Sequence, residues 1–343
     1  MNYSPYSTVH REVTNAPNKR LKIFTWHIHG SYLYYLSQGG YDIFVPINEL
    51  RTEGYYGLGK TFPFGSNVYE IPSEQVKNLE FDCILYQNNK NYFTDQYETL
   101  SIEQRQLPKI YLEHNPPIKH PTESKHIIED PSITIVHVTH FNKLMWNHNS
   151  NVATLVIEHG VMPSETTFKG EIERGIVVIN NLPECGRLLG LDLFLEVKKH
   201  IAIDLIGLGT EELGGREIPH PQLPEFISHY RFLFNPIRYA SLSLAVLEAM
   251  MIGIPVVAMA TNELSTVIRN GTNGYLHTDL KYLIQKMSKL LKDKNLASWM
   301  GIEGKLTVEE RFDIKRFTGQ WNDLFVSVIR ENTFRPKPIN VSK

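Results

Sequence analysis

Residues 234–258 constrain the fold of this chain more than any other segment, because they are apolar almost throughout. The stretch is long enough to be considered as a bilayer span, yet it contains one acid, Glu248, and the break Gly253-Ile254-Pro255. A carboxylate buried without a partner costs several kcal/mol, so Glu248 must meet a polar group or a ligand. The segment therefore predicts a buried helix, a tight turn and a buried strand instead of a membrane helix.

Length and composition are those of a soluble globular protein with two domains. A chain of 343 residues can give each of two domains its own core. Hydrophobic residues make up 42% and charged residues 21%, and 35 basic groups nearly balance 37 acidic ones, which argues against a nucleic-acid binder. Cys83 and Cys185 lie far apart, which argues against a disulfide framework or a cysteine zinc site and favours a reducing cytoplasm.

Strand-like apolar runs alternate with mixed segments through the first half, a pattern typical of a doubly wound α/β domain. We expect strands at 21–27, 43–46, 83–87, 110–113, 133–138 and 153–157. The first run leads into His29, Gly30 and Ser31, where the glycine permits a tight turn and Ser31 is expected to cap a helix. Turns of this kind face ligand crevices, which makes His27, His29 and Gly30 candidate ligand contacts.

The second half repeats the α/β pattern after a polar stretch, 162–174, that we take as the linker. Strands are expected at 175–180, 204–207, 230–235 and 255–260, with helices between them and hence a parallel sheet. Apolar residues then recur at helical spacing up to Val328 and predict a closing amphipathic helix. The predicted divisions are an N-terminal arm (1–20), a first domain (21–165), a second domain (166–312), a helix (313–330) and a tail (331–343).

The segment 234–258 resembles the donor-binding motif of retaining family 4 glycosyltransferases, which belong to glycosyl transferases group 1. Matching positions are Pro236, Leu244, Leu247, Glu248, Ala249, Met250, Gly253, Pro255, Val256, Val257 and Ala258. In that family a first glutamate touches the donor sugar and a second touches the nucleotide ribose. Glu248 matches the second, whereas the first position is Ala240. The sugar must therefore be recognised by other groups, and Arg238, Asn235 and Ser241 are the nearest polar candidates.

The resemblance implies the GT-B fold, in which two Rossmann-like doubly wound domains face a crevice and the C-terminal helix crosses back to the N-terminal domain. It implies transfer of a sugar from a nucleotide-diphosphate sugar to a saccharide or lipid-linked acceptor, as in polysaccharide biosynthesis, with retention and without a metal or other cofactor. The first domain would bind the acceptor and the second the donor. We expect a cytoplasmic protein, with peripheral attachment to the inner face of the membrane left open.

A helix N-terminus within the motif is the strongest candidate for the donor phosphates. The backbone N–H groups of Ser241, Leu242, Ser243 and Leu244 are expected to start this helix and to suit a diphosphate. Glu248 would then lie within two turns, in reach of ribose hydroxyls. The alternative is that Glu248 forms a salt bridge with a neighbouring helix.

Two further segments of the second domain carry donor-site candidates. In the family, the loop after the first strand of this domain brings a basic residue to the phosphates, and Arg187 is the cation found there. A merely solvated arginine is the alternative. Gly207 and Gly209 follow a strand and resemble the family's Gly-x-Gly turn near the nucleotide, although alone they are a weak signal.

The first domain offers His114 as a catalytic candidate. It ends a strand where the family has a histidine facing the crevice, so it is expected to bond the transferred sugar or shuttle a proton; the alternative is that it fixes the turn at Pro116 and Pro117. His27, His29 and Gly30 are assigned to the acceptor side. The glycine-rich and aromatic segment 54–65 predicts a mobile loop that lays rings against an acceptor, or plain loop packing.

The mechanism expected from the resemblance is front-face transfer. Arg187 and the helix N-terminus would stabilise the leaving diphosphate, which helps to take the proton from the attacking hydroxyl. The scattered histidines show no metal-ligand spacing, so no metal site is predicted. Two alternatives stay open, a GT-B epimerase or hydrolase acting on a nucleotide sugar and a catalytically degenerate nucleotide-sugar-binding partner.

Overall fold

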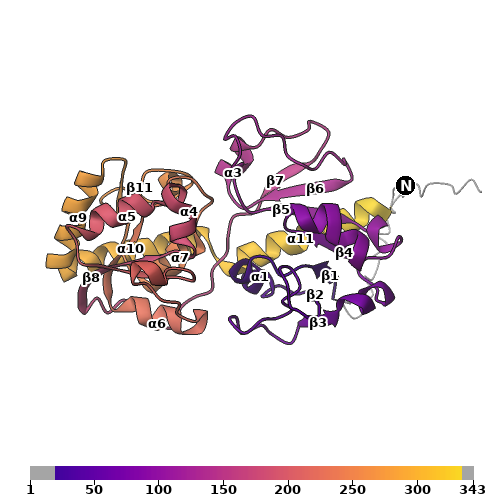
Figure 1. Ribbon diagram of the computed structural model, residues 1–343, viewed down its shortest axis with the longest axis horizontal. Helices are drawn as coiled ribbons and strands as arrows, with labels where there is room; N and C mark the ends of the chain where they lie inside the picture. Colours follow the sequence, from indigo (N-terminus) through magenta and orange to yellow (C-terminus); the bar gives the residue numbers. More distant parts are fainter. Residues whose placement is uncertain (1–19, 334–343) are drawn as a thin grey trace, which may run out of the picture.

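The computed structural model describes residues 20–333 and shows two α/β units side by side (Figure 1). The first unit contains a seven-stranded sheet in the order β3-β2-β1-β4-β5-β6-β7, in which neighbouring strands are parallel. Its strands are β1 (Lys22–Thr25), β2 (Asp42–Ile47), β3 (Val68–Pro72), β4 (Cys83–Tyr86), β5 (Lys109–Glu113), β6 (Ile133–His137) and β7 (Thr154–Val156). The strand order reverses between β1 and β4, and ligand crevices form at such points.

The second unit is built around a five-stranded parallel sheet in the order β12-β11-β10-β8-β9. Its strands are β8 (Ile172–Val178), β9 (Ile203–Ile206), β10 (Tyr230–Asn235), β11 (Val256–Met259) and β12 (Gly274–His277). The four residues of β11 are all buried, which explains the unbroken apolar run in the sequence. Here the order reverses between β8 and β10, which places a second switch point opposite the first unit.

Helices of varied length surround the sheets. They are α1 (Gly30–Leu36), α2 (Gln96–Thr99), α3 (His140–Met145), α4 (Leu182–Leu189), α5 (Leu191–Lys198), α6 (Leu223–Ser228), α7 (Leu244–Ile252), α8 (Leu264–Val267), α9 (Leu280–Lys292), α10 (Lys294–Arg311) and α11 (Ile314–Thr333). Short 3₁₀ turns occur at Ser73–Asn78, Gln104–Gln106, Glu211–Leu213 and His220–Gln222, and a π-helical turn at Asn91–Asp95. Among residues 20–333, no helix combines the length and apolar character needed to cross a bilayer.

Helix α11 crosses from the second unit to the first (Figure 1). Its buried face carries Phe317, Trp321 and Phe325, each with no exposed surface. The Trp321 indole N–H donates to the Tyr32 hydroxyl of α1 at 3.0 Å. This helix completes the predicted GT-B architecture of two Rossmann-like doubly wound units, which the structure confirms.

Several predicted boundaries differ from the structure. Strand β8 begins at Ile172, inside the predicted linker, because its first two residues are exposed and the next, Arg174, pairs with Asp204, so this end carries no buried apolar run. The prediction that Ser31 caps α1 is wrong: His29 precedes the helix and Ser31 lies within it. Helix α11 continues through Thr333, past the predicted boundary at 330. The predicted arm and tail fall mostly on residues outside those described.

Two strands, β3 and β12, were not predicted from the sequence. Strand β3 is an edge strand with exposed Tyr69 and Glu70, so it lacks a continuous apolar run. Strand β12 is also at an edge, and only its first two residues, Gly274 and Tyr275, are buried. Short edge strands give a weak periodic signal because one of their sides meets solvent.

Candidate functional site

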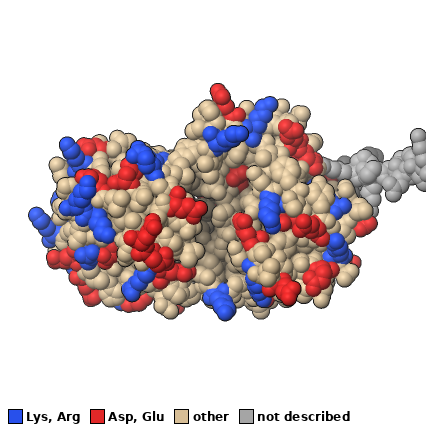
Figure 2. All heavy atoms as spheres, in the orientation of Figure 1, with Lys and Arg blue, Asp and Glu red and all other residues tan. Residues whose placement is uncertain are grey.

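A cavity of about 340 Å³ lies between the two units. The first unit contributes residues at the start of α1 and from the loop 54–65, and the second contributes the ends of β8 and β9 and the start of α7. Its polar and aromatic lining is Ser31, Thr61, Phe62, Asn180, Glu217, His220, Ser243 and Glu248. Figure 2 shows that the surface is hollowed between the two lobes, with acidic side chains on both sides. The crevice predicted from the sequence is therefore present.

Glu248 lies in this cavity on α7, as predicted. Its Oε1 atom accepts a hydrogen bond from the Tyr35 hydroxyl at 2.6 Å and one from His220 Nε2 at 3.0 Å. Tyr35 belongs to α1, so the first of these bonds joins the two units. Burial, together with the Glu248 charge, raises the pKa of Tyr35 well above its usual value, so Tyr35 is a neutral hydroxyl donor. Among residues 20–333, the basic side chain within salt-bridge distance of Glu248 is His220, which belongs to a 3₁₀ turn and not to a neighbouring α-helix.

The N-terminus of α7 also faces the cavity, but it starts later than predicted. Ser243 is the N-cap and Leu244 the first helical residue, and both line the cavity. The first N–H groups of a helix have no partner within it, so they are available to an anion. Ser241 and Leu242 belong instead to the preceding loop, where the Ser241 hydroxyl accepts from Asn142 and the Leu242 carbonyl accepts from His159 Nε2.

Neither Arg187, predicted for the donor phosphates, nor Arg238, predicted for the donor sugar, lines the cavity. Arg187 contacts Asp192 at 2.6 Å, and 75% of its side chain is exposed. The Arg238 guanidinium donates hydrogen bonds to both carboxylate oxygens of the same Asp192, at 2.5 and 2.7 Å. Hydrogen bonding to Arg238, with the charges of both arginines, lowers the pKa of Asp192. The described cavity lining contains no Lys or Arg at all.

Gly207 and Gly209 lie in the loop after β9, as predicted. Gly207 lines the cavity and has a φ of 148°. A Cβ added there would lie 2.1 Å from the carbonyl oxygen of Ile179, so glycine lets the loops after β8 and β9 approach each other. Gly209 lies beside the cavity, in an adjoining hollow with Asn181. The Leu208 N–H donates to Asn180 Oδ1 at 2.9 Å and ties the two loops together.

Replacing Gly207 with alanine will lower the free energy of unfolding by about 1–3 kcal/mol, because the new methyl group meets backbone and the φ is unfavourable. The shift in the denaturant midpoint of unfolding measures this loss of stability. Gly319→Ala is the control: Gly319 is in α11 with open space around its Cβ position, so alanine should stabilise that helix slightly. Equal stability of the two variants would contradict the close approach at Gly207.

His114 is buried and does not line the cavity, so the predicted catalytic histidine is not presented there. Its Nε2 lies 3.1 Å from Gln87 Oε1, and the ring of His29 lies over it with centroids 4.0 Å apart. Burial, with the neighbouring His29 and His159, holds the pKa of His114 well below its usual range. Burial, with His27 nearby, lowers the pKa of His29 to about 4. Both rings are therefore neutral at pH 7.

His27 faces a second hollow, of about 630 Å³, beside the cavity. Its Nδ1 lies 2.5 Å from the Gly57 carbonyl oxygen. A carbonyl only accepts, so Nδ1 carries the proton and Nε2 is a bare acceptor. Burial lowers the pKa of His27, which keeps the ring neutral. The hollow is lined by His27, Arg51, Tyr56, Leu58, Gly59, Lys60, Thr61, Phe62 and Glu70, and it shares Thr61 and Phe62 with the cavity.

Gly30 has a steric role at the junction of the two hollows. A Cβ there would lie 2.4 Å from the Phe62 ring and 3.0 Å from His27 Nε2. Phe62 in turn packs against His220 of the second unit, with ring centroids 4.7 Å apart. The glycine therefore makes room for the loop 54–65 to reach across the crevice.

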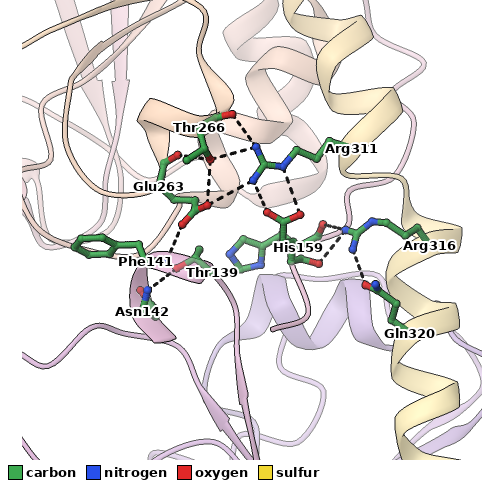
Figure 3. Close-up of polar contacts among 10 residues, drawn as sticks. Thr139, Phe141, Asn142, His159, Glu263, Thr266, Arg311, Arg316 and Gln320 are labelled. Atoms are coloured by element: carbon green, nitrogen blue, oxygen red, sulfur yellow. Dashed lines mark hydrogen bonds and ion pairs between the residues drawn. The ribbon is translucent and has the colours of Figure 1, made fainter. Parts of the chain in front are cut away.

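Polar contacts join the two units away from the cavity (Figure 3). The buried carboxylate of Glu263, in the second unit, accepts from the Phe141 N–H of α3 at 2.8 Å. Arg311 lies 2.5 Å from Glu158 and 3.5 Å from Glu263. Arg316 donates to the carbonyl oxygens of Glu158 and His159. None of these residues lines the cavity.

The sequence did not single out Tyr35, His220, Glu263 or Arg311. Each of them pairs with a residue that is distant in the sequence, and nothing in the local sequence marks such a pairing.

The described residues, 20–333, contain no group of three or more His, Cys, Asp or Glu side chains placed to hold a metal ion.

Comparison with known proteins agrees with this geometry. Residues 198–293, which run from the end of α5 to the end of α9, match the family described as glycosyl transferases group 1. The chain resembles that family. A curated protein of similar sequence is the N-acetyl-alpha-D-glucosaminyl L-malate synthase of Bacillus anthracis, 30% identical over 187 residues. The aligned part covers 54% of this chain and 46% of the relative, so the chain spans about half the length of the curated protein it matches.

Solved structures share this fold, two of them over about nine-tenths of the chain. A sucrose-phosphate synthase from Thermosynechococcus elongatus matches 91% of this chain and 100% of its own, with a TM-score of 0.62 and 14% identity. HepE of Anabaena, solved with UDP and glucose, matches 90% of this chain and 99% of its own, also with a TM-score of 0.62 and 14% identity. TarM matches 71% of this chain and 54% of its own, with a TM-score of 0.54 and 16% identity. These similarities establish the fold.

Proposed function

We propose that this protein is a glycosyltransferase that moves a sugar from a nucleotide-diphosphate sugar to a saccharide acceptor. The observation that carries the proposal is the position of Glu248, inside the cavity and on the helix whose N-terminus faces the same space. A carboxylate there suits ribose hydroxyls, and free N–H groups suit a diphosphate. The fold shared with HepE, which was solved with UDP and glucose, supports a nucleotide-sugar donor.

The donor phosphates need a cation that the cavity lacks, and Arg187 is the candidate. Arg238 already holds both oxygens of Asp192, so Asp192 remains paired when Arg187 leaves it. The Arg187 side chain is mostly exposed, and Leu189 of the same helix lines the cavity. We therefore assign Arg187 to the leaving diphosphate and Arg238 to holding Asp192. As negative charge grows on the diphosphate, Arg187 and the start of α7 stabilise it.

Arg187→Ala will weaken binding of a nucleoside diphosphate about tenfold, because one charge-assisted contact is lost, and will leave binding of the bare nucleoside unchanged. Calorimetric titration of both ligands measures the difference. The control is Arg174→Ala, which breaks an Arg–Asp pair at the opposite end of β8. Equal weakening of nucleoside and diphosphate would contradict the assignment of Arg187.

The hollow beside the cavity is our candidate for the acceptor. Tyr56 and Phe62 offer ring faces to a saccharide, and His27 Nε2 offers a neutral acceptor to a hydroxyl group. Since the hollow shares Thr61 and Phe62 with the cavity, an acceptor held there would reach the donor sugar. His29 and Gly30 shape the boundary between the two spaces. The acceptor is then a saccharide, free or lipid-linked, and a lipid-linked one would bring peripheral attachment to a membrane.

We further propose that transfer proceeds with retention and without a metal, which the resemblance to family 4 supports. Chelation with EDTA should then leave turnover unchanged.

A catalytically degenerate nucleotide-sugar-binding partner is the second candidate function. Ala240 at the first glutamate position and a cavity lining without Lys or Arg favour it. An epimerase or hydrolase would need an acid and a base beside the sugar, and His29 and His114, which are buried, neutral and outside the cavity lining, do not supply them.

A thermal-shift screen of UDP, GDP, ADP, dTDP and their sugar conjugates tests the proposed donor. A ligand that binds only the folded protein raises its melting temperature by mass action. We expect a shift with one nucleotide and its conjugates. The absence of a shift with every member of the panel would remove the basis for a nucleotide-sugar donor.

A further inference from the structure

His27 is a buried histidine whose two ring nitrogens have different surroundings. Its Nδ1 atom donates to the Gly57 carbonyl oxygen at 2.5 Å. Its Nε2 atom has no hydrogen-bond partner among residues 20–333, and its side chain lines the hollow of about 630 Å³ beside the cavity. The ring that borders the proposed acceptor space therefore carries a free lone pair.

A tight turn holds the Gly57 carbonyl against His27. The Leu58 N–H donates to Glu70 Oε1 at 2.7 Å, and the backbone N–H of His27 donates to the Gly54 carbonyl at 3.2 Å. Gly57 has a φ of 61°, and a Cβ added there would overlap Glu70 Oε1, so a side chain does not fit. The backbone around the turn is anchored, and it keeps the ring proton of His27 on Nδ1.

The other ionisable groups that line this hollow are poor proton acceptors. Arg51 and Lys60 carry positive charge, and Tyr56 presents a phenol. Arg51 donates to both oxygens of Glu70, at 2.7 and 3.4 Å, and this hydrogen bonding lowers the pKa of Glu70. Within the described lining, His27 is thus the group suited to take a proton at neutral pH.

We propose that His27 is the general base of transfer, and that its Nε2 atom takes the proton of the attacking acceptor hydroxyl. The inference rests on the proposed function, because it needs an acceptor in the hollow. The acceptor oxygen forms its bond to the anomeric carbon while the bond from that carbon to the diphosphate breaks, and the nucleoside diphosphate leaves with the electron pair. The hydroxyl proton moves to Nε2, the imidazolium keeps its bond to Gly57, and water then takes the proton. The proton thus has an acceptor on the protein in place of the leaving diphosphate.

Transfer should depend on pH, because His27 must be neutral to act. Burial lowers the pKa of His27 and outweighs the bond to Gly57, which raises it. The titratable or charged groups around the ring are His29, Arg51, Tyr56, Lys60 and Glu70. We expect kcat/KM to rise as the pH is raised through this lowered pKa and to be level at pH 7.

Two substitutions of His27 separate a base from a hydrogen-bond acceptor. His27→Gln offers an amide oxygen to a hydroxyl but cannot hold a proton at neutral pH, and His27→Asn keeps a donor toward Gly57 and removes Nε2. Both should lower kcat about 100-fold or more and lose the rise with pH, while calorimetry shows unchanged nucleotide binding. The control is His120→Gln, which replaces an exposed histidine that lines neither space and should leave kcat unchanged.

The assay follows release of nucleoside diphosphate between pH 5 and 8. Its donors are UDP-glucose, GDP-mannose, ADP-glucose and dTDP-glucose, each with a mixture of saccharides. If His27→Gln keeps the kcat of the unaltered protein, or keeps the rise with pH, the inference is overturned and the proposed function stands. If the unaltered protein releases no diphosphate with any donor, the proposed function fails and the inference with it.

Nitrogen-15 NMR of the His27 ring gives a readout that needs no substrate. At pH 7 we expect a proton on Nδ1 and none on Nε2, as the bond to Gly57 requires. A proton on Nε2 would contradict the assignment of this atom as the base, whatever the kinetics of the variants.

Discussion

Replacing Glu248 with alanine will weaken nucleotide binding by about 2–3 kcal/mol, roughly a hundredfold, because hydrogen bonds from ribose to a charged acceptor are lost. The effect should be smaller for a 2′,3′-dideoxy nucleotide, which has no ribose hydroxyls to lose. Titration calorimetry with the nucleotide that binds the unaltered protein measures both values.

The matched control for that variant is Glu217→Ala. Glu217 is an acid that lines the same cavity, and its removal takes away the same charge. Binding to Glu217→Ala should be unchanged or slightly tighter, since a negative charge near the diphosphate is removed. A loss as large as that of Glu248→Ala would show that cavity charge, and not a ribose contact, governs affinity.

Trp321→Ala will lower the free energy of unfolding by about 3–5 kcal/mol. Trp321 is fully buried on α11, its N–H bonds the Tyr32 hydroxyl, and its ring packs against Phe325 at 5.3 Å between centroids. Alanine leaves a cavity and an unpaired buried hydroxyl where α11 crosses onto the first unit. Urea denaturation followed by circular dichroism measures the change.

Trp299→Ala is the control for Trp321, since it removes the same side chain from α10 at a position with 47% exposure. Trp299→Ala should lower the free energy of unfolding by less than about 1 kcal/mol, as is usual for substitutions at the surface. Equal destabilisation of the two variants would contradict a specific role for Trp321 in packing α11 against the first unit.

Much of the fold could be predicted because its central strands are buried on both faces. The runs of β4 and β11 consist of buried apolar residues, and the Gly253 to Pro255 break separates α7 from β11 as expected. The edge strands β3 and β12 are not evident in the sequence because several of their side chains meet water, whereas the edge strands β7 and β9 have apolar runs that predict them. The start of α7 was placed too early since the apolar loop residue Leu242 looks like a helical one; its burial comes from the loop packing into the core.

The site was only partly predictable, for a physical reason. Glu248 stood out because a lone acid in an apolar helix must have a partner, and the structure supplies Tyr35 and His220. Tyr35 becomes a partner only because the two units face each other, and His220 because a turn of the second unit lies over α7, and no local pattern encodes either placement. Arg187 and His114 were chosen from their places on the chain, whereas Asp192 and Gln87 decide where their side chains point.

Sugar transfer itself is tested most directly by incubating the protein with sugar-labelled nucleotide sugars and a mixture of saccharides and following release of the nucleoside diphosphate. We predict release that requires an acceptor and labelled sugar that becomes attached to it. Binding of a nucleotide sugar with no release under any of these conditions would contradict a transferase and favour a protein that only binds the nucleotide sugar.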